Sequence, residues 1–313
     1  MEIVDKMLSR KLLLISGKGG VGKSFFASCL ASYAAKHGKR VLLVEHTLRS
    51  QISPLFGIDN VEHTETVYND AIFGINLDAK ECFREYVVDY LGMNHLYNKI
   101  FGRKVMRSFL EAIPGLNELM VLGRLIRGVS GGKKVGQEID LVVFDAPASG
   151  HFYKLLTTPD AVINSGLVGP LVREIEKIRS FLFDKELCSY LLVSVPEELV
   201  RSETLEFINK ISTSVPIFLE AVIVNRALRQ QDHQSECFSR ELRNIYQEKS
   251  ELGSYIIKIM EKRRLEQLRF MEDLEVVGLE QRTMCIPDFG IVMEPLSKQF
   301  HSQIWDEAYI DGR

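Results

Sequence analysis

The chain lacks several features that would place it outside the ordinary intracellular globular proteins. No stretch approaches the 18 uninterrupted apolar residues that a membrane-spanning helix needs. The first residues, Met1–Lys6, lack the layout of a signal peptide. The five cysteines are scattered, odd in number and without C-x-x-C spacing, so no disulfide framework is expected. These absences favour a reduced, cytoplasmic setting.

The sequence also lacks an excess of charge of one sign. Its 39 Lys and Arg residues nearly balance 42 Asp and Glu residues, which gives a formal net charge of −3. Because nucleic-acid binding proteins carry a basic footprint, no nucleic acid is expected as a partner. The length of 313 residues fits one large α/β domain, or one domain with a sizeable insertion.

The most informative segment is Gly17–Ser24, which reads GKGGVGKS and directly follows the apolar run Leu12–Ser16. It satisfies the phosphate-loop pattern G-x-x-x-x-G-K-[ST]. Its glycines remove side chains that would hold the backbone away from a polyanion, so that their N–H groups can surround phosphates. Residues 24–36 are helix-compatible and would direct a helix N-terminus at the same phosphates. A chance glycine-rich turn is the alternative, but the order strand, loop, helix and strand (Val41–Val44) argues against it.

The two lysines of this loop have different expected roles. Lys23 would bridge the β- and γ-phosphates, while the Ser24 hydroxyl would ligate Mg²⁺. The Lys18 side chain is expected to leave the loop in a direction that does not suit its own nucleotide. In a face-to-face dimer it would reach the γ-phosphate of the other subunit and act as an arginine finger does. The alternative is a solvated lysine without a role.

Apolar, β-branched runs alternate with helical stretches along the chain. The five runs are Leu12–Ser16, Val41–Glu45, Leu141–Asp145, Leu191–Val195 and Ala221–Asn225. This alternation predicts an α/β fold with a mostly parallel twisted sheet flanked by helices. The phosphate-loop motif makes this the P-loop NTPase type. In such sheets ligands sit at the carboxyl ends of the strands.

We predict a single P-loop domain, 1–313, with an inserted helical subdomain. Residues 60–137 and 160–189 depart from the alternation and contain long helix-compatible stretches, so they are interpreted as two pieces of that subdomain beside the sheet. Residues 255–275 combine many charges with an apolar stripe, which indicates a surface helix.

The run that ends in Asp145 continues as Asp145-Ala-Pro-Ala-Ser-Gly150-His151. A carboxylate at the end of a buried strand can hold Mg²⁺ or its waters against the phosphates. Gly150 can approach the γ-phosphate through its backbone N–H and so sense its presence, as switch loops do.

Together, GKGGVGKS and DAPASGH make the chain resemble the ArsA family, which contains arsenite-pump ATPases and ATPases that target tail-anchored membrane proteins. The ArsA family belongs to the deviant-Walker group of P-loop NTPases. The resemblance covers about residues 11–290. It implies ATP and Mg²⁺ as cofactors, Lys18 acting across a homodimer, Asn225 at the adenine edge and Pro287 lining the adenine pocket. The nucleotide-binding residues expected in all are Gly17, Gly19, Gly20, Val21, Gly22, Lys23, Ser24, Phe25, Gly150, Asn225 and Pro287, with Ser24 and Asp145 at the metal.

One departure from the family concerns the segment after the second strand. The family normally has Asp-Pro-Ala there, and its Asp orients the attacking water, whereas this chain reads Glu45-His46-Thr47. Glu45 keeps a carboxylate one methylene further out, and a base misplaced by about 1 Å can lose roughly 10²-fold in rate. We expect Lys18, Glu45 and Asp145 to be the catalytic residues. One alternative is that the chain hydrolyses ATP only weakly, as a subunit of a heteromeric complex. Another is that Glu45 is a surface carboxylate without a catalytic role.

The sequence leaves the partner open. A homodimer is expected, and a heterodimer with a related ATPase is the alternative. Leu, Phe and Met residues of the inserted region could line a groove for a hydrophobic protein client or membrane protein, although ordinary core packing explains them as well. Cysteines at metalloid or zinc-clamp spacing, a basic amphipathic C-terminal helix and cysteines for an iron–sulfur cluster are not found.

Overall fold

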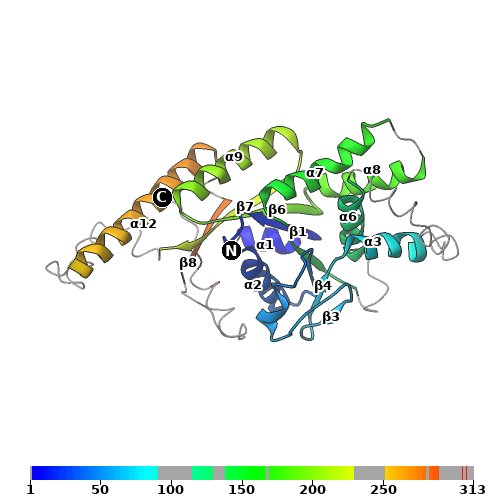
Figure 1. The fold of residues 1–313 in the computed structure, drawn as a ribbon, viewed down its shortest axis with the longest axis horizontal. Helices are drawn as coiled ribbons and strands as arrows, with labels where there is room; N and C mark the ends of the chain where they lie inside the picture. Colours follow the sequence, from blue (N-terminus) through cyan, green and yellow to red (C-terminus); the bar gives the residue numbers. More distant parts are fainter. Residues whose placement is uncertain are drawn as a thin grey trace.

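The computed structural model describes residues 2–90, 115–129, 138–166, 169–228, 251–279 and 282–288, together with Trp305 and Ala308. Eight strands form one sheet in the order β3-β4-β2-β5-β1-β6-β7-β8. Figure 1 shows this sheet among the helices. Their bounds are β1 Leu12–Gly17, β2 Val41–Glu45, β3 Thr66–Val67, β4 Ile72–Asn76, β5 Leu141–Asp145, β6 Cys188–Ser194, β7 Leu219–Ala227 and β8 Thr283–Pro287.

The strands are parallel except for the short hairpin partner β3, which runs antiparallel to β4. Strands β1, β2, β4, β5, β6 and β8 are buried at every position. Continuous burial requires apolar side chains on both faces, which explains why these strands appear as unbroken apolar runs in the sequence. The predicted α/β fold with a mostly parallel sheet is confirmed.

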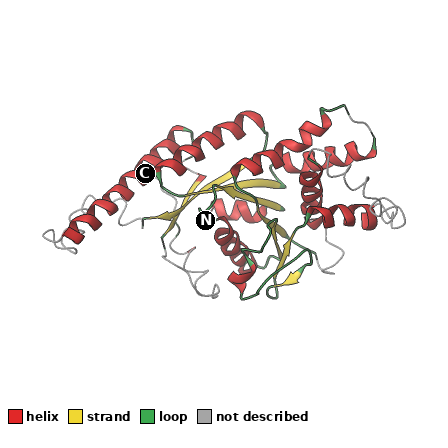
Figure 2. Ribbon diagram, viewed as in Figure 1, coloured by secondary structure: helices red, strands yellow, loops and turns green. Residues whose placement is uncertain are grey.

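Helices cover both faces of the sheet (Figure 2). One face packs against α1 (Glu2–Ser9) and α2 (Lys23–Lys36), and Trp305 also packs on this side. The opposite face packs against a larger set of helices. These are α3 (Ala79–Glu85), α6 (Leu116–Val129), α7 (Ser149–Ile163), α8 (Pro170–Phe183), α9 (Glu198–Ser214) and α12 (Glu251–Val276). A π-helical turn, η2 (Tyr86–Tyr90), follows α3, and a 3₁₀ turn, η1 (Ser53–Phe56), follows β2.

The bounds expected for the inserted helical pieces differ from the structure. The range 60–137 contains β3 and β4, and β4 pairs with β2 inside the main sheet, so its first residues are not helical. The second piece was expected to end at 189, but β6 begins at Cys188. Gly74 interrupts the apolar pattern of β4 because the Tyr68 side chain packs where a Cβ would lie. Residues 91–114 and 130–137 fall outside the described residues, and the division into a sheet domain and a helical subdomain stays a prediction.

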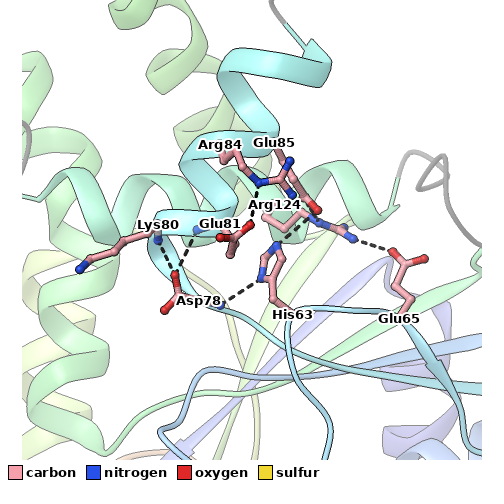
Figure 3. A network of polar contacts seen from close by, with 8 residues as sticks. All are labelled: His63, Glu65, Asp78, Lys80, Glu81, Arg84, Glu85 and Arg124. Carbon is pink, nitrogen blue, oxygen red and sulfur yellow. Dashed lines mark hydrogen bonds and ion pairs between the residues drawn. The ribbon is translucent and has the colours of Figure 1, made fainter. Parts of the chain in front are cut away.

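A cluster of buried charges joins the β3–β4 region to the helices α3 and α6 (Figure 3). The Arg124 guanidinium of α6 donates to Glu85 Oε2 at 2.9 Å and to Glu65 Oε1 at 2.5 Å. His63 Nε2 lies 3.3 Å from the other Glu85 oxygen, and its Nδ1 accepts the Asp78 N–H. All of these charged groups are buried, so each depends on its partners rather than on water.

Replacement of Arg124 by alanine should lower the free energy of unfolding by about 3–5 kcal/mol, because it leaves two buried carboxylates without their cation. Urea unfolding at neutral pH measures this loss. Arg179→Ala is the matched control, since Arg179 pairs with Asp160 at a half-exposed position and should cost about 1 kcal/mol or less. Equal losses in the two variants would contradict a dependence on burial.

Candidate functional site: a phosphate loop beside an acidic strand end

The phosphate loop connects the carboxyl end of β1 to the first turn of α2. Gly22 adopts a φ of 96°, in the left-handed region that favours glycine, and a Cβ there would lie 2.4 Å from Asn225 Nδ2. A Cβ on Gly17 would lie 2.0 Å from the Val193 carbonyl oxygen. Glycine at these two positions is therefore required by the fold itself, before any ligand is considered.

Lys23 is the first residue of α2 and points back over the loop. Its ammonium donates to the Lys18 carbonyl oxygen at 3.1 Å. Burial lowers the pKa of Lys23, and the nearby Asp145 carboxylate opposes this shift. A partly desolvated cation whose partner is a backbone carbonyl can exchange that partner for a phosphate.

Asp145 lies at the end of β5, next to β1, and meets Ser24 of α2. The Ser24 hydroxyl donates to Asp145 Oδ2 at 2.5 Å, while Asp145 Oδ1 is buried without a hydrogen-bond partner within the described residues. Burial raises the pKa of Asp145 to about 6, reinforced by Glu45 and opposed by Ser24 and Lys23. A hydroxyl in contact with a carboxylate that keeps one oxygen unsatisfied fits Mg²⁺, which prefers oxygen ligands.

Lys18, expected to act across a dimer, forms an ion pair within its own chain. Its Nζ lies 2.7 Å from Glu203 Oε1 of α9, and both side chains are substantially exposed. The pair therefore holds the lysine at the surface of the loop. An exposed pair of this kind contributes about 0–1 kcal/mol, so it can open at little cost.

Glu45, expected to orient the attacking water, is 2% exposed, so the alternative of a surface carboxylate is wrong. Its oxygens accept hydrogen bonds from the Ser50 hydroxyl, the Gln51 N–H at 2.7 Å and the Ile52 N–H at 3.1 Å. Burial raises its pKa, against the effect of these three donors. Its oxygens are thus occupied by the following loop.

The remaining expected residues lie at the same edge of the sheet. Asn225 of β7 donates its amide to the Val21 carbonyl oxygen at 2.8 Å, which ties the loop to β7. Pro287, at the end of β8, pairs with Ala227 two residues further along β7. Gly150 is in the first turn of α7, and a Cβ there would meet nothing within 4 Å. Phe25, in the first turn of α2, is partly buried and packs against the core between the sheet and the helices α1 and α2.

Sequence reasoning missed the side chains that hold these residues in place. Glu203 was not among the expected site residues, and its ion pair with Lys18 joins positions 185 residues apart. Ser50 and Asn76 carry no motif. Asn76 became recognisable only once β4 was seen to pair with β2, because its amide then faces the loop after β2.

A strand, a glycine-rich loop and a helix N-terminus, set beside a buried acidic strand end in a parallel sheet, define a P-loop NTPase. A family model described as anion-transporting ATPase matches residues 10–168 and 167–284. The chain therefore belongs to this ArsA ATPase family, which confirms the resemblance seen in the motifs.

Individual relatives agree with this family. The chain is 30% identical over 227 residues to ATPase BagA of Mycobacterium tuberculosis, covering 69% of this chain and 65% of that protein. It is 24% identical to ATPase ASNA1 homolog 2 of Paramecium tetraurelia, covering 74% and 80%. It is also 24% identical to ATPase GET3 of Phaeosphaeria nodorum, covering 73% and 80%. The alignment thus spans somewhat less than two thirds of the length of the mycobacterial relative.

Two features are absent from the part of the chain that the structure describes. None of its helices combines the length and the apolar character needed to cross a membrane. No group of three or more His, Cys, Asp or Glu side chains converges there as a metal cluster.

Gly22→Ala should destabilise the protein even without nucleotide, because the new Cβ meets Asn225 and forces a left-handed backbone on alanine. The expected loss is at least about 1–2 kcal/mol of unfolding free energy, measured by urea unfolding. Gly19→Ala is the control, since a Cβ at Gly19 meets nothing within 4 Å. Equal stability of the two variants would contradict the steric argument.

Asp145 should make the stability of the nucleotide-free protein depend on pH. Its pKa is about 6 when folded and about 3.9 when unfolded, so the unfolded state binds fewer protons between these values. Stability from this group is therefore present below pH 4 and is lost as pH rises through 6, by about 2–3 kcal/mol. The Asp145→Asn variant should not show this loss when its free energy of unfolding is compared at pH 4.5 and pH 7. Parallel pH curves for the two proteins would contradict it.

Proposed function

We propose that the protein is a Mg²⁺-dependent ATPase whose nucleotide state controls a protein partner. The contact between Ser24 and Asp145 is the observation that carries this proposal. It places a hydroxyl and a carboxylate with one unsatisfied buried oxygen at the mouth of the phosphate loop. Family membership and relatives named as ATPases support the same activity.

Each residue of the site has a role in this proposal. The loop N–H groups and Lys23 would hold the β- and γ-phosphates, and Ser24 and Asp145 would hold Mg²⁺, which supplies neutralising charge when bound. Water attacks the γ-phosphorus, and the bond to the β,γ-bridging oxygen breaks to give ADP and phosphate. Positioning and charge stabilisation account for most of the catalysis in such transfers. Gly150 would sense the γ-phosphate at the start of α7, and Asn225 and Pro287 would border the adenine.

We further propose that two copies close on each other around the nucleotides. Lys18 would then leave Glu203 and reach the γ-phosphate held by the other copy. The low cost of opening an exposed ion pair supports this exchange. Closing would rearrange the helices around α6 and α8 and so regulate a hydrophobic protein client or a membrane protein.

A second candidate function is a weakly hydrolysing subunit that pairs with a related ATPase. The contacts of Glu45 favour it, because a carboxylate that accepts three hydrogen bonds from its own loop is poorly placed to take a proton from water. In that case the chain would bind ATP tightly, but turnover would need a residue from the other subunit.

Steady-state ATP hydrolysis and sedimentation with MgATP test the proposal. Lys18→Ala should lower kcat by about 10³–10⁵-fold, as loss of an arginine finger does, while MgATP binding persists. Asp145→Asn should weaken MgATP binding in a Mg²⁺-dependent way. Lys185→Ala is the control and should behave as wild type, because Lys185 lies just before the amino end of β6, whereas the site is at the carboxyl ends of the strands.

The two candidates predict different results for the wild-type chain. Turnover and dimerisation of the pure protein with MgATP support the homodimeric ATPase. Tight MgATP binding with no turnover supports the heteromeric subunit. A monomer with MgATP whose turnover is insensitive to Lys18→Ala would contradict the trans-acting lysine.

A further inference from the structure

The loop that follows β2, residues 46–53, is held in one conformation by Glu45, the last residue of that strand; we call this loop the arch. The Glu45 carboxylate accepts the Ser50 hydroxyl and the N–H groups of Gln51 and Ile52. Ser50 in turn accepts the Ser53 N–H, and the Tyr68 hydroxyl is hydrogen-bonded to Ser50. Residues 46–49 are thus a short span between two anchored ends.

The first two residues of the arch, His46 and Thr47, are hydrogen-bonded to the end of the neighbouring strand β4 and to the residue that follows it. Asn76, at the end of β4, accepts the Thr47 N–H at 3.0 Å and donates to the Thr47 carbonyl oxygen at 3.0 Å. The His46 ring bonds the Leu77 carbonyl oxygen at 2.8 Å. With both ends and one side fixed, the position of the remaining two residues is set by the fold.

The arch lies on the same face of the sheet as the phosphate loop. Glu45 and Asp145 are direct partners on adjacent parallel strands, so their side chains point to the same face and their backbones are about 4.8 Å apart. Asp145 meets Ser24 on that face. Ile52, at the far end of the arch, is fully buried in the same core cluster as Val21 and Phe26. The arch therefore spans from one side of the metal position towards α2.

Arg49 is the only cationic residue of the arch between His46 and Ser53 with a permanent charge. Its backbone carbonyl accepts from Thr47 Oγ1 and Gln51 Nε2, which fixes its backbone. Its guanidinium forms no hydrogen bond or ion pair with the described residues, and both Arg49 and the neighbouring Leu48 are exposed. A fixed backbone with an unengaged cationic head, beside the site of a polyanion, is the arrangement of a phosphate-binding arginine.

We propose that Arg49 contacts the terminal phosphates of bound ATP, and that Glu45 is the positioning residue that presents it. The inference rests on the proposed nucleotide site. It gives Glu45 a role that its occupied oxygens can perform, in place of proton transfer. Arg49 also supplies a positive charge on the β2 side of the site, opposite Asn225 and Pro287. Among the described residues of the phosphate loop and the arch, the other permanent cations are Lys18 and Lys23.

Calorimetric titration of the full chain with MgATP and with MgADP, combined with hydrolysis assays, tests the role of Arg49. Arg49→Ala should weaken MgATP binding at least about tenfold and MgADP binding much less, since an arginine–phosphate contact is charge-assisted. Arg49→Lys should recover part of the loss. Leu48→Ala, at the adjacent position that is also exposed, is the matched control and should bind both nucleotides as wild type.

The role of Glu45 is tested by comparing a conservative with a disruptive variant. Glu45→Gln keeps an acceptor for the Gln51 and Ile52 N–H groups and a polar partner for Ser50, so it should recover most of the affinity that Glu45→Ala loses. Glu45→Ala and Arg49→Ala should not add in the double variant, because the two residues act as a unit. Thermal unfolding of every variant checks that the chain is folded.

Several results would overturn the inference. Wild-type affinity for MgATP in folded Arg49→Ala would remove Arg49 from the phosphates while leaving the proposed ATPase intact. A Glu45→Gln protein that binds MgATP normally but loses turnover, with loss of the acidic limb of its pH–rate profile, would identify Glu45 as a base instead. A wild-type chain that does not bind MgATP at all would remove the proposed function as well.

Discussion

The hydrogen bond between Ser24 and Asp145 is the contact on which the rest of the site depends. It joins the first turn of α2 to the end of β5, and β5 lies between β1, which leads into the phosphate loop, and β2, which leads into the arch. Parallel strands bring all of these carboxyl ends to one edge. Asp145 is buried at the end of β5 beside Glu45, and its other carboxylate oxygen has no hydrogen-bond partner among the described residues. This is a local cost that a bound cation would relieve.

The acidic and basic side chains at this edge of the sheet differ in how firmly they are held. The carboxylates of Asp145 and Glu45 are buried and held by hydrogen bonds from neighbouring backbone and hydroxyl groups. The cations remain replaceable: Lys23 contacts a backbone carbonyl and Lys18 an exposed glutamate. Anionic ligands can therefore recruit positive charge without breaking a buried ion pair, whose loss would be far more costly.

The same elements connect the site with the distant helices. Glu45 and Asn76 end adjacent strands, and the Leu77 N–H bonds the Glu45 carbonyl oxygen. Asp78 follows directly, caps α3 through the Lys80 and Glu81 N–H groups, and donates its own N–H to His63 in the Arg124 cluster (Figure 3). The end of β2 and the contact between α3 and α6 are thus linked by consecutive residues and hydrogen bonds. The end of β2 is therefore only one hydrogen bond and two residues away from the start of α3.

The sequence by itself determined the phosphate loop, the acidic strand end and the parallel sheet, because each depends on short-range patterns such as glycine spacing and unbroken apolar runs. It identified the family for the same reason. Only the tertiary structure decided that β4 belongs to the sheet, that Glu45 is buried and occupied by Ser50, Gln51 and Ile52, and that Lys18 is paired with Glu203. A two-residue β3 and a glycine in β4 give no periodic signal, and an ion pair between positions 185 residues apart arises from packing. The pattern of the chain thus fixed which chemical groups are present at the site, whereas the conformation of the loop after β2 and the packing of α9 decided which of them are occupied.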